Sequence, residues 1–267
     1  MFAIVFPAFD PVIFQIGPFT VRWYALAYIV GLFAGLWYAR RLVTQPPALM
    51  TTAQVDDFLL WVLGGVVLGG RLGYVLFYKP GEYLSDPLSI LKTWEGGMSV
   101  HGGLLGVTLA IILYARHIKV DKWYVADLVA CAAPIGLFLG RLANFINGEL
   151  WGRVAPELPW GMVFPTGGPD TRHPSQLYQA ALEGLALFVI LHLLSRNENV
   201  RRHPGILTGT FWIGYGVFRI VGEFFREPDD FLGFIIGGAT MGQLLSVPMI
   251  AFGAFCIWRA RRAPAAV

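Results

Sequence analysis

The chain has 267 residues, and its 20 lysines and arginines exceed its 17 acidic residues to give a formal net charge of +3. Hydrophobic residues make up 56% and charged residues only 14%, with a mean hydropathy of +0.59. Soluble domains carry about 25% charged residues, so this composition argues against a water-soluble enzyme, and its apolar content excludes a disordered chain. A multipass membrane protein remains. In such a protein the basic residues set the orientation, so we expect no nucleic-acid partner.

The first 20 residues lack a basic stretch ahead of their apolar residues and include Asp10, Pro11 and Pro18. We therefore expect an interfacial segment rather than a cleavable signal. Seven later stretches are long and apolar enough to cross a bilayer as helices. They are 20–39, 56–78, 98–115, 123–145, 175–195, 205–225 and 239–258. We expect an all-α integral membrane protein of about seven transmembrane helices, built as one multipass domain over residues 1–267.

Basic residues gather in alternate connections between these helices. They are Arg40 and Arg41; Arg116, Lys119 and Lys122; Arg196, Arg201 and Arg202; and Arg259, Arg261 and Arg262. The positive-inside rule assigns these ends to the cytoplasm, which puts the N-terminus outside and the C-terminus in the cytoplasm. The Pro- and Gly-rich stretch 146–174 then forms an irregular outer, periplasmic loop region. No internal repeat supports an inverted-repeat transporter.

Polar side chains inside the expected helices gather toward the outer face. They are Tyr24, Arg71, His101, Arg141, Asn144, Arg219 and Glu223. An arginine at membrane depth costs about 2.5–3.5 kcal/mol on insertion scales, so Arg71, Arg141 and Arg219 at one level predict an anionic partner. Guanidinium groups match phosphate oxygens in pairs of hydrogen bonds, and the abundant phosphate in a membrane is a lipid headgroup. The alternative is internal ion pairing or reaching to the interface. Asp127 and Glu183 are exceptions to this distribution.

Two helices concentrate these groups. In 205–225, Tyr215, Arg219, Glu223 and Arg226 share one face, either as an ion pair that fixes packing or as the lining of a site. At the end of 123–145, Arg141 and Asn144 lie one turn apart and lead into the segment that holds Glu149, Gly152 and Arg153. Amide, carboxylate and guanidinium groups together could bind a phosphoglyceryl group; a helix cap with interface anchors is the alternative.

His101 lies among glycines in Gly96-Gly-Met-Ser-Val-His-Gly-Gly103, and glycines let a ligand approach the backbone closely. Histidine also suits proton transfer near neutral pH. The alternative is a hydrogen-bonded structural histidine. The neighbouring glycines and arginines favour a functional role.

The sequence lacks a Walker loop, His-Glu-x-x-His, Gly-x-Ser-x-Gly and Cys-x-x-Cys. These absences argue against ATP-driven, zinc-dependent and serine-hydrolase chemistry, and we expect neither a metal nor a cofactor. Cys131 and Cys256 lie in apolar runs toward the inner side, so we expect two buried free thiols. A thiol that takes part in the chemistry would come from a substrate.

Six segments in order carry a resemblance to a known family. They are Arg22-Trp-Tyr24, His101-Gly-Gly-Leu-Leu-Gly106, Gly140-Arg-Leu-Ala-Asn-Phe-Ile-Asn-Gly-Glu-Leu-Trp-Gly152, His173-Pro-Ser-Gln-Leu-Tyr178, the stretch 215–228 and Met241-Gly-Gln-Leu-Leu-Ser246. With them the chain resembles the bacterial phosphatidylglycerol:prolipoprotein diacylglyceryl transferases over almost its whole length. Gln179 departs from the glutamate expected in that family.

The resemblance implies a transferase of the inner membrane with its site toward the periplasm. Its reaction moves the diacylglyceryl group of phosphatidylglycerol, a membrane lipid, to the lipobox cysteine of a preprolipoprotein, the first step of lipoprotein maturation. The product is a thioether, and glycerol phosphate is released. No obligate protein partner follows from it.

The resemblance also implies roles for single residues. His101 is the candidate base, Tyr24 a second one, and Arg141 and Arg219 stabilise the leaving phosphate. Asn144 and Glu149 position the headgroup or the Arg141 fork, and Gly152 permits close approach. Tyr215, Glu223 and Arg226 take a supporting part.

Two other classes also account for outward arginines. A transporter or flippase of an anionic lipid needs them, but it usually has polar sites at the midplane, whereas the inner half of this chain is nearly bare of polar groups. A structural lipid-binding subunit needs phosphate contacts but no base at His101. Only the transferase makes a thioether on a cysteine peptide.

Overall fold

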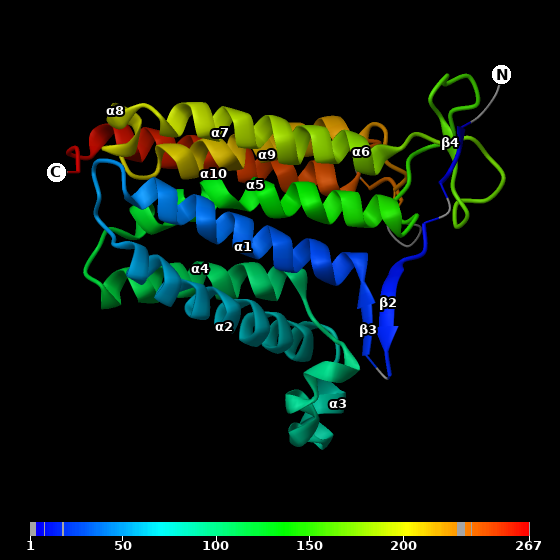
Figure 1. Ribbon diagram of the computed structural model, residues 1–267, viewed down its shortest axis with the longest axis horizontal. Coiled ribbons are helices and arrows are strands. Elements are labelled where there is room, and N and C mark those ends of the chain that lie inside the picture. Colours follow the sequence, from blue (N-terminus) through cyan, green and yellow to red (C-terminus); the bar gives the residue numbers. More distant parts are fainter. Residues whose placement is uncertain (1–3, 8, 18, 229–232, 236, 267) are drawn as a thin grey trace. The chain divides into compact units, whose positions relative to one another are not determined.

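A computed structural model describes residues 4–7, 9–17, 19–228, 233–235 and 237–266. The chain forms two compact units, one of Met1–Ala39 with Asp127–Val267 and the other of Arg40–Ala126. The expected single domain stays a prediction. The helices follow the apolar stretches of the sequence (Figure 1), and two of them continue through an internal proline, at Pro134 and at Pro248.

The helices and strands have the following bounds. The strands are β1 (Ile4–Val5), β2 (Val12–Ile16), β3 (Phe19–Arg22) and β4 (Met162–Val163). The α-helices are α1 (Trp23–Val43), α2 (Thr52–Phe77), α3 (Pro80–Ser85), α4 (Val100–His117), α5 (Lys122–Ile146), α6 (Ser175–Gln179), α7 (Leu187–Ser195), α8 (Glu198–Arg201), α9 (Ile206–Glu223) and α10 (Met241–Arg262). Two 3-10 turns, η1 (Pro87–Leu91) and η2 (Thr93–Glu95), and a π-helical segment, η3 (Ala180–Ala186), complete the described elements.

Six helices within the described residues are long and apolar enough to cross a membrane: α1, α2, α4, α5, the continuous α6–η3–α7 and α10. The fold class is therefore confirmed as a helical, multipass membrane protein. The remaining expected span, 205–225, corresponds to α9, which has 18 residues and packs along α10. Arg219 and Glu223 lower its apolar character, so the count of seven spans stays a prediction.

Two helices begin at a capping box that their apolar pattern does not include. The expected span 56–78 begins as α2 at Thr52, because Thr51 and Gln54 form such a box. In this box each side chain accepts a hydrogen bond from the other residue's backbone N–H. Thr240 and Gln243 form the same box at the start of α10. Short polar side chains thus extend the helix beyond the apolar pattern.

The N-terminal segment, expected to lie at the interface, contains strands. β2 and β3 pair in antiparallel fashion across a turn at Gly17, whose φ of +57° suits glycine. β1 pairs in parallel with β4, which joins the N-terminus to the 146–174 stretch. Apart from the end of α5 at Ile146, that stretch contains no helix among its described residues, as the prolines and glycines predict. Its backbone is instead held by isolated bridges such as Gly152 to Arg226.

In the unit of residues 40–126, α2 and α4 meet along a seam of glycines. Gly65, Gly69 and Gly73 of α2 face Gly102 and Gly106 of α4 so closely that a Cβ at Gly65 would lie 2.6 Å from the carbonyl oxygen of Gly106. Small residues at four-residue spacing let membrane helices approach in this way. Gly102 beside His101 therefore serves helix packing, where the sequence suggested access for a ligand.

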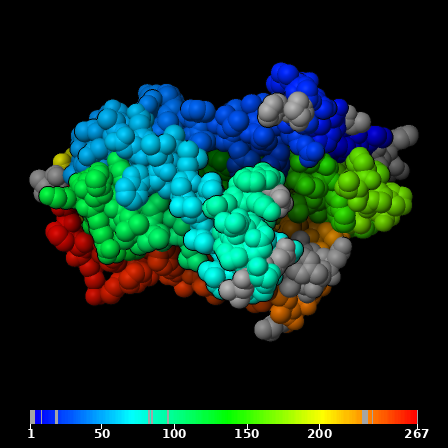
Figure 2. All heavy atoms as spheres, turned by 90° about the horizontal axis from the view of Figure 1, so that it is seen from below, coloured from blue at the N-terminus to red at the C-terminus, as the bar shows by residue number. Residues whose placement is uncertain are grey.

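Arg71 in the same unit is buried and bound by its own chain. Its guanidinium donates hydrogen bonds to backbone carbonyls of the segment that follows α3, those of Ser89, Ile90, Lys92, Gly96 and Gly97. It also lies 5.0 Å from the centre of the Tyr83 ring. Figure 2 shows the atoms of residues 80–95 gathered in one turquoise lobe. Arg71 thus holds this lobe and does not offer a free fork to a phosphate, which corrects its expected place among the ligand-binding arginines.

In the unit that includes residues 127–267, Asp127 caps a helix from a distance. Its carboxylate accepts hydrogen bonds from the backbone N–H of Gly205 at 2.8 Å and of Thr208 at 2.7 Å, and from the Thr208 hydroxyl. These groups start α9, where free N–H donors collect. The buried carboxylate that stood out in the sequence is thus a structural cap. Cys131 and Cys256 are buried free thiols, as expected.

The glycine seam gives a stability prediction on two adjacent residues. Gly65→Ala should lower the free energy of unfolding by about 1–3 kcal/mol, because the new methyl group overpacks the contact with Gly106. Gly64→Ala should leave it unchanged or raise it, because nothing lies within 4 Å of its Cβ position and alanine favours helix by about 1 kcal/mol. Thermal unfolding of both purified variants in detergent measures the difference. Equal shifts for the two variants would contradict the seam.

Candidate active site

A cluster of charged side chains lies where α5, η3 and α9 meet. The Glu183 carboxylate accepts a hydrogen bond from the Arg141 Nη2 at 2.9 Å through one oxygen. Its other oxygen lies 3.6 Å from Nη1 of Arg219, which is an electrostatic contact longer than a hydrogen bond. Glu183 therefore stands between two guanidinium groups from two different helices.

The cluster continues along α9 to Glu223. Arg219 Nη2 lies 2.7 Å from Glu223 Oε1, and Arg226 Nη1 donates to the same oxygen at 3.2 Å. The other oxygen accepts a hydrogen bond of 2.6 Å from the hydroxyl of Thr240, the residue that caps α10. Because Arg219 touches both carboxylates, the two halves of the cluster form one network.

The exposure of these side chains is uneven. The side chains of Glu183 and Glu223 are 0% and 1% exposed, whereas those of Arg141 and Arg219 are 16% and 15% exposed. The carboxylates thus lie behind and the guanidinium groups form the accessible edge. Counted as ionised groups, three arginines with Arg226 and two glutamates leave one positive charge. This edge is suited to an anion that carries one negative charge.

Local structure explains how Glu183 reaches this position. It lies in the π-helical segment η3, and such segments are frequent at functional sites. Gly184 beside it packs so closely on α5 that a Cβ would lie 2.6 Å from the Cβ of Phe138. The missing side chain at Gly184 brings η3 onto α5 and with it Glu183 onto Arg141. The sequence marked Glu183 only as an exception, although Gln176, Gln179 and Glu183 fall on one helix face.

The end of α5 is fixed by the start of α6. The buried Asn144 donates a hydrogen bond of 2.7 Å to the exposed carboxylate of Glu149. Gln176 binds the Glu149 carbonyl at 2.7 Å, and the Ser175 hydroxyl binds the Leu150 carbonyl at 2.9 Å. Leu150 has a φ of +57°, a left-handed conformation that is costly for a leucine. Two side chains thus hold a strained turn that presents Glu149.

The remaining expected residues of this unit take different places. Tyr24, in the first turn of α1, pairs with Tyr28 through hydroxyl groups 3.2 Å apart. Tyr215 lies one turn before Arg219 on α9 and stacks on Phe211. Gly152 touches the chain's own backbone, since a Cβ there would lie 2.5 Å from the Phe225 carbonyl oxygen. The close approach expected at Gly152 is therefore made by protein.

His101 belongs to the other unit, in the first turn of α4 after the capping residue Ser99. Its side chain is exposed. The structure brings together Arg141, Arg219 and Glu223, and separately Asn144 and Glu149. The participation of His101 stays a prediction.

Two further residues near the cluster were not assigned by the sequence. Gln179 is fully buried one turn before Glu183, and its amide makes no hydrogen bond to the described residues. A Cβ on Gly222 would lie 3.6 Å from the Gln179 nitrogen and 3.8 Å from a Glu183 oxygen, so the amide adjoins the cluster. His173 packs against Tyr178 and Phe225 next to Gly152. Partial burial lowers the pKa of His173, which favours the neutral ring.

Comparison with known proteins identifies the family. The model of the family described as prolipoprotein diacylglyceryl transferase matches residues 11–259. The chain belongs to this family. A relative from Paramagnetospirillum magneticum is 57% identical over 98% of this chain and 97% of its own length, and one from Rhodospirillum rubrum is 58% identical over 98% and 96%. A third, from Rhizobium meliloti, is 54% identical over 98% and 95%. All three are named phosphatidylglycerol--prolipoprotein diacylglyceryl transferase.

Membership of the diacylglyceryl transferase family confirms that this chain is a transferase, as the six segments predicted. The relatives support this function and not a transporter or flippase. The charged cluster falls within the matched residues, since Arg141, Glu183 and Arg219 all lie between residues 11 and 259.

The buried position of Glu183 predicts a large effect of Glu183→Gln on stability. Removing the charge leaves Arg141 and Arg219 without their shared partner and should cost about 3 kcal/mol or more of unfolding free energy. Glu227→Gln is the control, because its ion pair with Arg172 is partly exposed and worth about 1 kcal/mol or less. Thermal unfolding in detergent compares the variants. A Glu183→Gln protein as stable as the control would mean that the cluster does not hold the helices together.

Proposed function

We propose that the chain transfers the diacylglyceryl group of phosphatidylglycerol to the thiol of the lipobox cysteine of a preprolipoprotein. The observation that carries this proposal is the guanidinium edge of Arg141 and Arg219, backed by buried carboxylates. The names of the relatives, which state phosphatidylglycerol and prolipoprotein, support the same substrates.

The phosphodiester of the lipid binds at the edge formed by Arg141 and Arg219. A phosphodiester carries one negative charge, and the cluster carries one uncompensated positive charge. Substrate binding therefore neutralises the site without any uptake of protons. Guanidinium forks also fix the orientation of the phosphate, because they present parallel donors to two of its oxygens.

The reaction is a substitution at carbon. The thiolate sulfur attacks the glyceryl carbon that carries the phosphate ester, a carbon–sulfur bond forms and the carbon–oxygen bond breaks. The electron pair of the broken bond stays on the departing glycerol phosphate, and Arg141 and Arg219 stabilise the charge that develops there. No metal or nucleotide is needed, because the phosphate ester already provides the leaving group.

The residues around the edge position the substrate. Asn144 and Glu149 face the headgroup hydroxyls or hold the Arg141 fork, and Glu223 orients Arg219 through its contact of 2.7 Å. Tyr215 lines the site beside Arg219. Gly152 fixes the loop, since no side chain fits between it and the backbone near Phe225.

A base must take the thiol proton, because a free cysteine has a pKa of about 8.5 and is mostly protonated at neutral pH. We assign this part to His101, whose exposed position in α4 leaves its ring accessible. Tyr24 is the second candidate, since it presents a hydroxyl group in the first turn of α1.

The direction of the basic residues supports an inner-membrane location with the site toward the periplasm. The last turns of α1, α4 and α10 are basic, whereas Arg141 and Glu149 lie at the opposite end of their segment from Lys122. The partners are then membrane phosphatidylglycerol and the lipobox peptide, with no further obligate protein.

The test of this function is mass spectrometry of a synthetic peptide. Purified protein in detergent is incubated with phosphatidylglycerol and a lipobox peptide, beside the same peptide with its Cys→Ser change. We expect a diacylglyceryl mass increment on the cysteine peptide alone, because only sulfur provides the nucleophile. No increment, in a preparation that binds phosphatidylglycerol, would leave the cluster as a lipid-binding site without transfer.

The assignment of His101 predicts a pH-dependent defect. His101→Gln should reduce turnover at least tenfold at about pH 7, where the substrate thiolate is scarce, in line with the usual contribution of a general base of about 10²–10⁴. The defect should shrink at about pH 9, where the thiol ionises without help. Rates of peptide modification at both pH values decide the matter. An equal loss at the two pH values would assign His101 to positioning instead.

A further inference from the structure

The ends of α9 and α10 far from the charged cluster hold two apolar grooves. The first has a volume of about 380 Å³ and is lined by Ile213, Ala254, Ile257, Trp258, Arg261 and Arg262. The second has a volume of about 390 Å³, and its lining includes Leu194, Val200, His203, Ile206, Ile257 and Arg261. We call them the first and second grooves. Both volumes lie in the range of pockets that bind small molecules.

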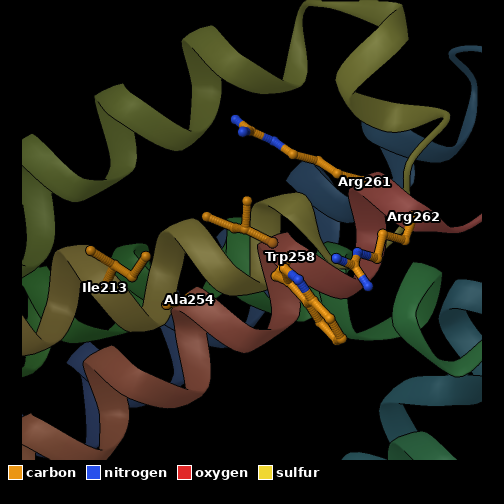
Figure 3. Close-up of a pocket in the computed structure, with 6 residues that line it drawn as sticks. Ile213, Ala254, Trp258, Arg261 and Arg262 are labelled. Atoms are coloured by element: carbon orange, nitrogen blue, oxygen red, sulfur yellow. The ribbon is translucent and has the colours of Figure 1, made fainter.

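The two grooves meet at one pair of residues. Ile257 and Arg261, one turn apart on α10, line both grooves. A positive group therefore stands where two apolar channels of similar size join. Figure 3 shows the Arg262 guanidinium beside the Trp258 ring and that of Arg261 pointing away from it. The Arg262 guanidinium lies 4.3 Å from the centre of that ring.

The charge of the grooves is unbalanced. Neither lining contains a carboxylate, and no ion pair of Arg261 or Arg262 occurs within the described residues. Other basic residues at this end are engaged: Arg202 with Glu198 at 2.8 Å, and Arg259 with the Pro204 carbonyl at 2.6 Å. Orientation by positive charge accounts for basic residues at a helix end, but not for two of them lining apolar grooves.

We propose that the junction of these grooves binds an anionic phospholipid, with the phosphate at Arg261 and Arg262 and one acyl chain in each groove. Basic pockets between membrane helices are known to take anionic headgroups. Apolar walls require acyl chains, so a free phosphate does not satisfy the site. Trp258 at this level suits the membrane interface.

This site is separate from the substrate site. Ile206 and Arg219 are 13 positions apart on α9, which at 1.5 Å per residue is about 20 Å. The lipid at the grooves is therefore retained and not consumed. It covers the exposed apolar side chains of α10 around Ala254 and Trp258.

Native mass spectrometry of the purified protein in detergent tests this proposal. Phosphatidylglycerol, or phosphatidylcholine with the same chains, is added, and the lipids retained per chain are counted. We expect the double variant Arg261→Gln with Arg262→Gln to retain one phosphatidylglycerol fewer than the unmodified protein. Arg116→Gln is the matched control, an exposed arginine in the last turn of α4 that lines neither groove, and should retain the full number.

A second variant changes the groove without changing charge. Ala254→Phe fills the first groove and should lose the same lipid, while its unfolding temperature without added lipid shows that the fold is intact. Equal phosphatidylglycerol counts in all variants would overturn the proposal, as would equal retention of phosphatidylcholine. The count does not depend on turnover, so the result is independent of the transferase assay.

Discussion

A carboxylate buried at membrane depth requires compensation, and Glu183 obtains it from Arg141 and Arg219. Neither arginine is on the same helix as Glu183, so the ion pairs fix α5, η3 and α9 against one another. An uncompensated charge in this position would cost several kcal/mol. The π-helical segment and Gly184 follow from this demand, because they bring the carboxylate to Arg141.

The same network suits the chemistry of an anionic leaving group. Arg141 and Arg219 are held in place before substrate arrives, so little reorganisation is needed when negative charge develops. Their carboxylate neighbours also reduce the net charge of the edge from three to one. A weaker positive field releases the glycerol phosphate product more readily than three uncompensated arginines would.

Hydropathy and charge predict the helical membrane fold and most spans, because long apolar stretches report directly on the bilayer. Features that depend on one side chain's partners are less accessible. The sequence suggests a ligand for Arg71, yet only the path of the 87–97 backbone shows that carbonyls surround it. Depth and family motifs identify Arg141 and Arg219 but not the role of Glu183, because no sequence pattern marks a π-helical turn. The start of α2 lies before the predicted one because a capping box extends the helix past its apolar residues.

The position of α9 illustrates how charge replaces apolar character. It is not among the six helices apolar enough to span the membrane, yet charges that match its dipole lie at both ends. Asp127 binds the free N–H groups at its start, and Arg219 and Arg226 lie near its C-terminal carbonyls. Glu223 opposes the dipole there but is paired with both arginines. The side chains that lower the hydropathy of α9 are thus the ones that stabilise its ends, and the same arginines provide the edge proposed to bind phosphate.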